Sequence, residues 1–152
     1  MMNPELTFQP LAPDQRGEAA TLLAAAGLCS NDLPQPQVEL FAVRKSGHTI
    51  GYWGYERYGE AALFRSLYLK PDYRQQGYGR QIWQQAKALL YQQGIRQVYL
   101  LTDTAADFFS RLGFVVVARE SAPPAIRQTS EFATFCPSGS VCMTISLSAA
   151  EK

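Results

Sequence analysis

The stretch that decides the fold is residues 70–90, KPDYRQQGYGRQIWQQAKALL, in which a Pro-Asp turn leads through two glycines into a helix. From Tyr78 to Leu90 apolar side chains recur at helical spacing, and Gly94 follows where a helix commonly ends. A helix that begins directly after such a turn points its first backbone N–H groups at one place, with the positive end of the helix dipole behind them. The stretch therefore predicts a site for an anion such as a diphosphate.

The side chains of this stretch support the same interpretation. Gly77 and Gly79 allow the backbone to approach a ligand without an intervening Cβ, and Arg74 and Arg80 can add charge-assisted hydrogen bonds. No Gly-Lys-Ser/Thr follows, so the loop is not a Walker A loop, and the Gly-x-Gly-x-x-Gly spacing of dinucleotide sites is absent. The alternative is a solvated tight turn that carries two surface arginines.

The flanking sequence predicts an α/β (α+β) chain with a mixed sheet and helices on its faces. The expected strands are residues 6–11, three strands within 38–70 separated at 46–47 and 58–60, then 96–102, 114–118 and 141–147. The expected helices run from a cap at Asp14 to about Ala26, over 78–93, and over a short segment closed by Gly113. Residues 119–139 contain three prolines and predict an irregular segment.

The composition is that of an ordinary globular protein, and 152 residues predict a single domain over 1–152. Apolar residues make up 47% and charged residues 18%, and the net charge of +1 gives no overall basic field that would attract nucleic acid. The longest uncharged apolar stretch, Ala19–Leu28, is too short to span a bilayer. The N-terminal residues lack the pattern of a secretory signal, so we expect a cytoplasmic protein with no membrane partner.

Cysteine and histidine usage argues against disulfides and metal. Cys29, Cys136 and Cys142 are an odd number and form no Cys-x-x-Cys pair, so a disulfide framework is not expected. The single histidine, His48, follows Gly47 in a predicted turn, where a histidine is usually solvated. With these few ligands the sequence predicts no metal site.

Two segments carry a resemblance to a known family. SLYLKPDYRQQGYGRQIWQQAKALLYQQG (66–94) resembles the acetyl-CoA-binding motif of the GNAT N-acetyltransferase superfamily, and LLTDTAADFFSRLGF (100–114) is similar to that family's next strand and helix. The order of the predicted elements also matches, so the resemblance covers roughly residues 5–147. It implies the GNAT fold, a central mixed, mostly antiparallel sheet of about seven strands with helices on both faces.

The resemblance implies acetyl-CoA as the cosubstrate and assigns residues to it. The loop that would hold the CoA diphosphate, through backbone N–H groups and two arginines, consists of Arg74, Gln75, Gln76, Gly77, Tyr78, Gly79 and Arg80. The backbone at Leu67 and Leu69 would pair with the pantetheine arm, where the strand leaves its neighbour at a bulge and a nearby N–H polarises the acetyl carbonyl. Thr102 falls where many members have a CoA-contacting asparagine, and Phe108 is expected to pack near the pantetheine.

Transfer of an acetyl group from a thioester to an amine needs a neutral amine, donors for the oxyanion and, in some enzymes, an acid for the leaving thiolate. Many family members supply that acid from a tyrosine that aligns here with Phe109, which has no proton to give. Tyr68, Tyr99 or a water could replace it. Alternatively no acid is needed, because a thiol with a pKa near 8.5 is a tolerable leaving group.

Carboxylates on the predicted strands are the candidates for the general base. Glu56 is the first choice, since it lies on the strand beside the expected bulge, and Glu39 is the second. The alternative for Glu56 is a structural ion pair with Arg57 or Arg65. The predicted catalytic residues are therefore Glu56, Tyr68 and Glu39.

The C-terminal third suggests the acceptor. Residues 100–114 resemble the acetyltransferase domain of N-acetylglutamate synthases, and 122–143 resemble a group of GNAT proteins associated with arsenic resistance. The pieces shared with that group are Pro124-x-Ile126-Arg127, Glu131-Phe132, and Cys136-Pro137-Ser138 leading to Cys142-Met143. Both resemblances imply a small amino-acid-like acceptor, and Arg65 and Arg127 are the candidates to bind its carboxylate. For Cys136 and Cys142, buried structural thiols are favoured over ligands for arsenic.

Three functions remain open at this point. The first is an acetyl-CoA-dependent N-acetyltransferase for a small amine, acting by direct attack. The second is a non-catalytic acetyl-CoA-binding sensor or partner module, which Phe109 favours. The third is a protein or peptide acetyltransferase, against which the absence of an acidic run counts. A homodimer that pairs through an exposed last strand is a further expectation.

Overall fold

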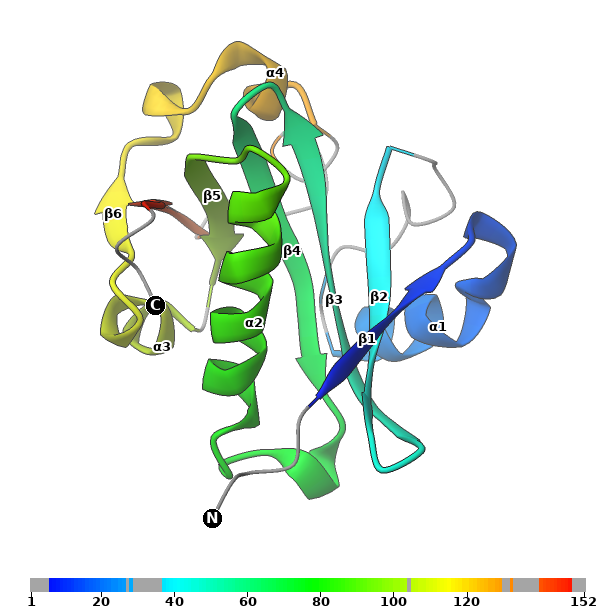
Figure 1. Ribbon diagram of the computed structural model, residues 1–152. Helices are drawn as coiled ribbons and strands as arrows, with labels where there is room; N and C mark the ends of the chain where they lie inside the picture. Colours follow the sequence, from blue (N-terminus) through cyan, green and yellow to red (C-terminus); the bar gives the residue numbers. More distant parts are fainter. Residues whose placement is uncertain are drawn as a thin grey trace. The chain divides into compact units, whose positions relative to one another are not determined.

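The computed structural model describes residues 6–26, 28, 37–103, 105–129, 132 and 140–148. Within them lies a seven-stranded mixed sheet in the order β1-β2-β3-β4-β5-β7-β6 (Figure 1). The strands are β1 (Thr7–Leu11), β2 (Glu39–Lys45), β3 (His48–Tyr58), β4 (Ala61–Leu69), β5 (Gln97–Thr102), β6 (Val115–Val117) and β7 (Val141–Ser146). The helices are α1 (Gly17–Ala25), α2 (Tyr78–Gln92), α3 (Ala106–Arg111) and α4 (Pro124–Arg127), with 3-10 turns η1 (Pro13–Gln15), η2 (Pro71–Tyr73) and η3 (Arg119–Ser121).

The predicted fold class is confirmed, and three details of the prediction are wrong. Asp14 does not cap the first helix, because it lies inside η1 and α1 begins after Arg16. The segment expected to be irregular contains η3 and α4, whose proline at the first position is compatible with a helix start. The last strand, β7, is not an edge of the sheet, because it lies between β5 and β6. Predictions for Cys29, Glu131 and residues 136–138 lie outside the described residues.

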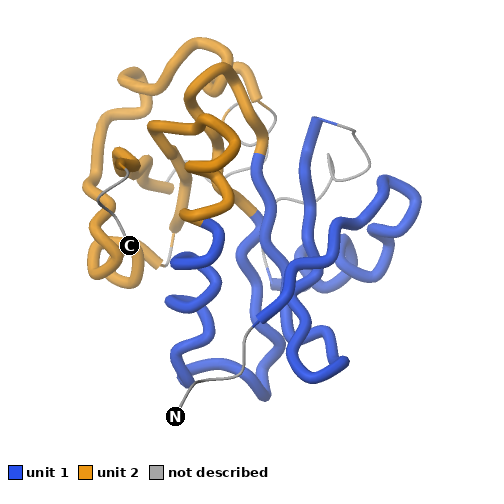
Figure 2. Tube along the Cα trace, in the orientation of Figure 1, with its two compact units in different colours: residues 1–55, 66–86 blue, residues 56–65, 87–152 orange. Residues whose placement is uncertain are grey.

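The chain divides into two compact units (Figure 2). Unit 1 comprises residues 1–55 and 66–86, and unit 2 comprises 56–65 and 87–152. β3, β4 and α2 each run from one unit into the other along the chain. That the whole chain forms a single domain stays a prediction.

Unit 1 is built around the antiparallel strands β1, β2 and β3. On one face, α1 buries Ala19 and Leu23 against Leu40, Ala42 and Tyr52 of the sheet. Side chains alternate between the two faces of a strand, so the residues next to these point to the other face. Figure 1 shows the first turns of α2 on the side of these strands opposite to α1.

The other face of unit 1 carries a row of aromatic side chains. Trp53 lies across from Phe41 in the β2–β3 ladder, with ring centroids 4.9 Å apart, and its ring is 5.8 Å from that of Tyr55. Phe8 of β1 meets the edge of Trp53 at 5.2 Å. Such cross-strand aromatic pairs stabilise a sheet and fix its register.

Unit 2 is organised by β5, which pairs along its whole length with β7 and at its start with β4. The β4–β5 ladder is parallel and spans Ala61–Leu63 and Gln97–Tyr99. Beside it, Phe109 of α3 is buried among other phenylalanines, with ring centroids 6.2 Å from Phe64 and 5.5 Å from Phe114.

Two searches of the described residues gave negative results. None of their helices combines the length and the apolar character that crossing a membrane requires. Nor do they contain a group of three or more His, Cys, Asp or Glu side chains placed to hold a metal ion.

Candidate active site

The loop between β4 and α2, which the sequence predicts to bind an anion, has an unusual backbone conformation. Two of its residues are in the left-handed region, Gln75 with φ of 62° and Gly77 with φ of 89°. Alternation of left- and right-handed residues turns successive N–H groups toward the same side, which forms a concave set of donors. A Cβ placed on Gly77 would meet nothing within 4 Å, so the backbone angle, and not lack of room, calls for glycine here.

The first turn of α2 adds donors to this loop. The N–H of Gln81 is the first to bond back along the chain, to the carbonyl of Gly77 at 3.1 Å. The N–H groups of residues 78–80 therefore have no acceptor inside the helix, and they lie at the positive end of its dipole. Six residues, 75–80, thus present their backbone at the mouth of a fifteen-residue helix.

Side chains of the loop brace it from within. Arg74 donates from Nε to the carbonyl of Leu69 at 2.7 Å, and its guanidinium lies over the Tyr68 ring at 5.4 Å. Gln76 donates from Nε2 to the carbonyl of Asp72 at 2.7 Å. Because the bond to Leu69 uses only Nε, the Nη groups of Arg74 can still donate hydrogen bonds to a ligand.

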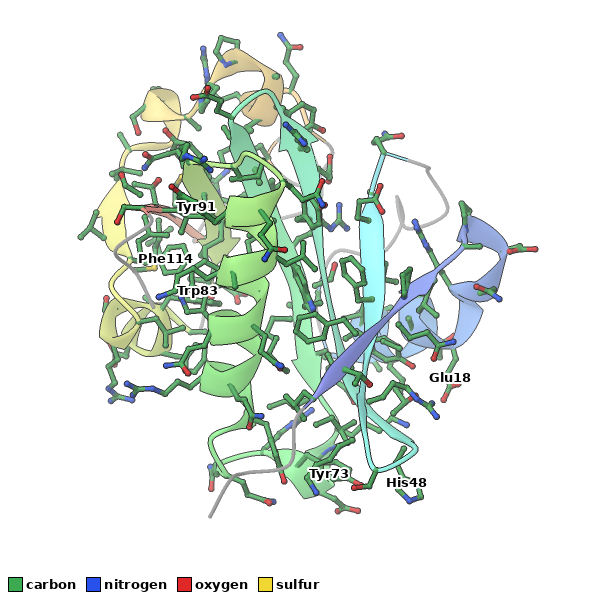
Figure 3. All side chains as sticks on the ribbon, viewed as in Figure 1. Glu18, His48, Tyr73, Trp83, Tyr91 and Phe114 are labelled. Atoms are coloured by element: carbon green, nitrogen blue, oxygen red, sulfur yellow. The ribbon has the colours of Figure 1, made fainter. Side chains whose placement is uncertain are left out.

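Tyr73 and Lys45 also lie at this loop, and the sequence did not predict a role for either of them. The ring of Tyr78 lies 6.1 Å from that of Tyr73, which Figure 3 labels on the loop before α2, and the ammonium of Lys45 lies 5.9 Å from the Tyr78 ring. Lys45 belongs to the hairpin of β2 and β3, far from the loop in sequence. Only the pairing of the strands brings it to the loop, so no local pattern could have predicted it. His48 is exposed at the start of β3, in the same hairpin.

The strand that leads into the loop contains a distortion at Ser66. Its φ is 64°, in the left-handed region, although it is a buried non-glycine residue inside β4. A left-handed residue within a strand marks a bulge, and bulges are frequent next to active sites. Leu67 and Leu69, the expected partners of the pantetheine arm, follow this bulge and are half-buried.

Directly after the bulge, β3 and β4 approach each other closely. A Cβ on Gly51 would lie 2.1 Å from the carbonyl oxygen of Tyr68, so this position requires glycine. The N–H of Lys70 donates to the carbonyl of Ile50 at 2.8 Å. The end of β4 is therefore fixed to β3 up to the start of the loop.

Tyr68, a predicted catalytic residue, stacks on Tyr52 of β3 with ring centroids 6.4 Å apart. Tyr52 is buried, and burial raises its pKa above the ordinary value, with smaller contributions from the negative charge of Glu18 and from Tyr68. Tyr52 therefore stays neutral and can act only as a hydrogen-bonding or packing group near neutral pH. The side chain of Tyr68 is half-buried.

Unit 2 holds the other residues expected to contact the donor. Thr102 ends β5, and its hydroxyl accepts a hydrogen bond from the N–H of Ala105 at 3.0 Å, which shapes the turn into α3. Phe108 is half-buried, with its ring centroid 5.0 Å from that of Phe109. Thr102 therefore has a local structural role whether or not it also contacts CoA.

Glu56, the first candidate for the base, is engaged on both carboxylate oxygens. Arg65 donates from Nη1 to its Oε2 at 2.6 Å, and the Tyr58 hydroxyl donates to its Oε1 at 2.5 Å. The Arg65 and Glu56 side chains are only 0% and 3% exposed. Arg57, the other predicted partner, instead donates from Nε to the carbonyl of Gly59. The ion pair with Arg65 given as an alternative is thus present.

The remaining candidates differ in accessibility. Glu39 is exposed at the start of β2, across from Tyr55. Arg127 is exposed on α4, where its Nε donates to the carbonyl of Ala122 at 3.0 Å. The two arginines predicted to bind an acceptor carboxylate are therefore unlike, since Arg127 is open to solvent and Arg65 is enclosed.

Cys142, the one cysteine among the described residues, is buried in β7. Burial raises the pKa of its thiol to about 11, partly offset by the positive charge of Arg119. A protonated, enclosed thiol is a poor nucleophile and metal ligand, which supports the expected structural role.

Comparison with known proteins places the chain in a family. A model of the acetyltransferase (GNAT) domain matches residues 36–116, just over half of the chain. An uncharacterised N-acetyltransferase of Chlorobaculum tepidum is 29% identical over 110 residues, which are 72% of this chain and 68% of that protein. The chain therefore belongs to the GNAT acetyltransferase family.

Solved structures show the same fold at low identity. N-acetylglutamate synthase from Neisseria gonorrhoeae, complexed with coenzyme A and N-acetyl-glutamate, superposes with a TM-score of 0.77 at 14% identity over 97% of this chain. The match takes up only 36% of that synthase. A Mycobacterium tuberculosis protein in complex with CoA gives 0.73 at 15% identity, over 93% of this chain and 99% of that one.

Family membership confirms three predictions made from the sequence: the GNAT fold, an N-acetyltransferase, and acetyl-CoA as the cosubstrate of the family. The roles of individual residues, the acceptor, and the likeness to arsenic-resistance proteins stay predictions.

Proposed function

We propose that this chain transfers the acetyl group of acetyl-CoA to the amine of a small amino-acid-like acceptor by direct attack. The observation that carries the proposal is the left-handed Ser66 in β4, followed along the chain by a loop with left-handed residues at 75 and 77. The N–H groups of residues 78–80, after that loop, have no acceptor inside α2. In the proposal, the polarising backbone and the diphosphate site therefore belong to one continuous piece of chain.

In this proposal the donor is held mainly by backbone. The N–H groups of residues 75–79, with Arg80 and the Nη groups of Arg74, bind the diphosphate. The backbone of Leu67 and Leu69 pairs with the pantetheine arm, while Thr102 and Phe108 are the proposed contacts from unit 2. Backbone donors of this kind cost no rearrangement during the reaction, because the strand and loop hold them in place.

The chemistry proceeds by attack of the acceptor nitrogen on the acetyl carbonyl carbon. The carbonyl oxygen gains negative charge, which N–H groups beside Ser66 stabilise. The C–S bond then breaks, the amide forms, and the nitrogen's surplus proton leaves to the base or to water. Phe109 offers no proton to the departing thiolate. Either Tyr68 supplies one, or none is needed, because a thiol with its ordinary pKa is a tolerable leaving group.

Two carboxylates, Glu39 and Glu56, are the candidates for the base. Glu39 is exposed and free to act, whereas Glu56 must give up the hydrogen bond of Tyr58 or Arg65 to accept a proton. Tyr68 lies next to the bulge and is the candidate to replace the family's acid. A pH–rate profile separates them, since only the true base shifts or removes the acidic limb when it is replaced by its neutral counterpart.

For the acceptor we propose an amino acid or analogue whose carboxylate is bound by Arg127. Arg127 is exposed, and within the described part of the protein only its Nε donates a hydrogen bond. Its two Nη groups can therefore form a bidentate pair with a carboxylate. The likeness to a synthase complexed with N-acetyl-glutamate supports the same class of acceptor. Arg65 is the weaker candidate because its side chain is fully enclosed.

The test is thiol release from acetyl-CoA across a panel of amino acids, L-glutamate first, with arsenic-containing analogues and basic peptides as comparison. Binding is checked by thermal shift, in which a ligand at 100 times its Kd stabilises a protein by about 2.7 kcal/mol. Binding with turnover on amino acids supports the proposal. Binding with no turnover on any acceptor would favour the sensor module, and turnover on peptides alone would favour a protein acetyltransferase.

A further inference from the structure

The side chains around Glu56 form a closed cluster in unit 2. Arg65 and Glu56 are ion-paired at 2.6 Å with almost no exposed surface, and Tyr58 occupies the second carboxylate oxygen. Taking two charges out of water is costly, and their attraction regains this only when the geometry is good and the remaining groups are satisfied. Such a pair is weak evidence for a role in stability, so its presence calls for another explanation.

Arg65 is peptide-bonded to the strained residue of β4. Ser66 is left-handed, and a non-glycine residue with that conformation persists only where its surroundings enforce it. On the N-terminal side, the guanidinium of Arg65 is fixed to Glu56 of β3. On the C-terminal side, the contact of Gly51 with Tyr68 and the bond from Lys70 to Ile50 fix the strand again. Ser66 therefore lies between two anchors.

We propose that Glu56, with Tyr58, is a positioning residue that acts through Arg65 to hold Ser66 in its left-handed conformation. This extends and rests on the proposed function, in which N–H groups beside Ser66 polarise the acetyl carbonyl. Without the ion pair, the bulge can relax to an ordinary extended strand, and its N–H groups turn away from the position of the developing charge. The role of Glu56 is then conformational, and Glu56 does not accept a proton from the acceptor amine during the reaction.

The proposal differs from general-base catalysis in what can rescue a Glu56 variant. Glycine adopts the left-handed conformation without the steric cost that serine pays. If Glu56 works by holding Ser66, Ser66→Gly should restore function to a protein that lacks the ion pair. If Glu56 is the base, no change at position 66 can supply the missing proton acceptor.

The readout is the carbonyl band of bound acetyl-CoA, labelled with ¹³C at the carbonyl carbon and measured by difference infrared spectroscopy. Hydrogen bonds that polarise the carbonyl move this band to lower wavenumber, whether or not an acceptor is present. Calorimetry with acetyl-CoA runs beside it, so that loss of binding is distinguished from loss of polarisation. If the unaltered protein shows no binding, the proposed function itself fails and this inference falls with it.

The main variant is Glu56→Gln with Arg65→Met, which removes both charges together and keeps an acceptor for the Tyr58 hydroxyl. Paired removal avoids leaving one buried charge without its partner. We expect the protein to bind acetyl-CoA with the band shift reduced and kcat lowered about tenfold, the rate equivalent of 1.36 kcal/mol. Adding Ser66→Gly should recover most of both. Adding Ser66→Ala, which removes the hydroxyl but keeps the steric cost, should recover neither.

Two results would overturn the proposal. One is a charge-free double variant that folds and keeps the unaltered band and rate. The other is a loss that Ser66→Gly leaves unchanged. If circular dichroism shows that the double variant does not fold, Tyr58→Phe replaces it, because this change loosens Glu56 without burying a bare charge. There we expect about a threefold fall in kcat, reversed by Ser66→Gly; absence of either effect counts against the proposal.

Discussion

The loop before α2 and the interior of unit 2 differ in whether their groups have partners within the protein. At the loop, the N–H groups of residues 78–80 have no acceptor inside α2, and the side chains of Arg74 and Gln76 bond to nearby carbonyls. In unit 2, the carboxylate of Glu56 is fully used and the ring of Phe109 is packed on several sides. The loop thus has N–H groups with no partner inside its helix, whereas Glu56 and Phe109 in unit 2 have partners within the protein.

The difference between the two regions shows which kinds of residue indicate function in a member of this family. An open donor set is informative because it leaves unsatisfied what proteins normally satisfy. A charged residue in the right strand is less informative, because a neighbour can satisfy it.

The aromatic interior should respond to truncation with a loss of stability. Phe109→Ala should lower the free energy of unfolding by about 3–5 kcal/mol, because it leaves a cavity among Phe64, Phe108 and Phe114. Denaturant unfolding measures this, with the half-buried Phe108→Ala as a matched change of smaller effect. Phe109→Tyr should not accelerate the reaction; a variant about ten times faster or more would show that a general acid was missing.

The loop should respond to a change of backbone preference with a loss of binding. Gly77→Val should weaken acetyl-CoA binding about a hundredfold, since a β-branched residue is strained at its φ of 89°. Calorimetry measures the affinity. Gly17→Val is the matched control, because Gly17 also has open space around a Cβ and lacks a positive φ. Equal effects of the two changes would contradict the proposed role of the loop.

The open arginine of unit 2 should affect the acceptor alone. Arg127→Ala should raise the acceptor KM about tenfold, as expected for one lost charge-assisted pair, and leave the acetyl-CoA KM unchanged. Steady-state kinetics with the best amino acid of the panel measures both. Arg57→Ala is the control, since Arg57 likewise is exposed and donates its Nε to a nearby carbonyl. An unchanged acceptor KM would remove Arg127 from the site.

The closed interior should also show in the dependence of stability on alkaline pH. The pKa of Cys142 is raised from 9.0 to about 11 by burial, so its thiol ionises more readily in the unfolded chain. Its contribution to stability is complete below pH 9 and is lost as the pH rises through 11, by at most about 2.7 kcal/mol. Cys142→Ala should flatten the fall in stability over that range. Identical slopes would mean that the thiol is not protected.

Much of the fold could be predicted from the sequence because its signals are local. The turns at Ser46-Gly47 and Tyr58-Gly59 separate the three central strands, and each turn glycine has positive φ. The helix that begins at Tyr78 was predicted from its spacing and ends within a residue of the expected place. The diphosphate loop could be proposed for the same reason, since glycines near a helix start are visible in the chain itself, and its role stays a prediction.

The parts that escaped prediction depend on partners distant in sequence or on competition between neighbours. The sequence offered Glu56 either Arg57 or Arg65, and only strand geometry decides for Arg65. The left-handed conformation of Ser66 carries no sequence signal, because serine does not prefer it. Asp14 is a suitable cap, but Pro13 draws it into η1, and the helix begins after Arg16 instead.

The position of β6 at one end of the sheet order has a consequence for handling the purified protein. It offers free main-chain groups over three residues only, and Val115 and Val116 are 58% and 60% exposed there. An edge strand as short as β6 offers a second molecule too few main-chain hydrogen bonds for fibril-like growth. Short edge strands are one way in which natural sheets avoid aggregation. At this end of the sheet, self-association in concentrated stocks would depend on the exposed side chains of Val115 and Val116, and mild changes of solvent should reverse it.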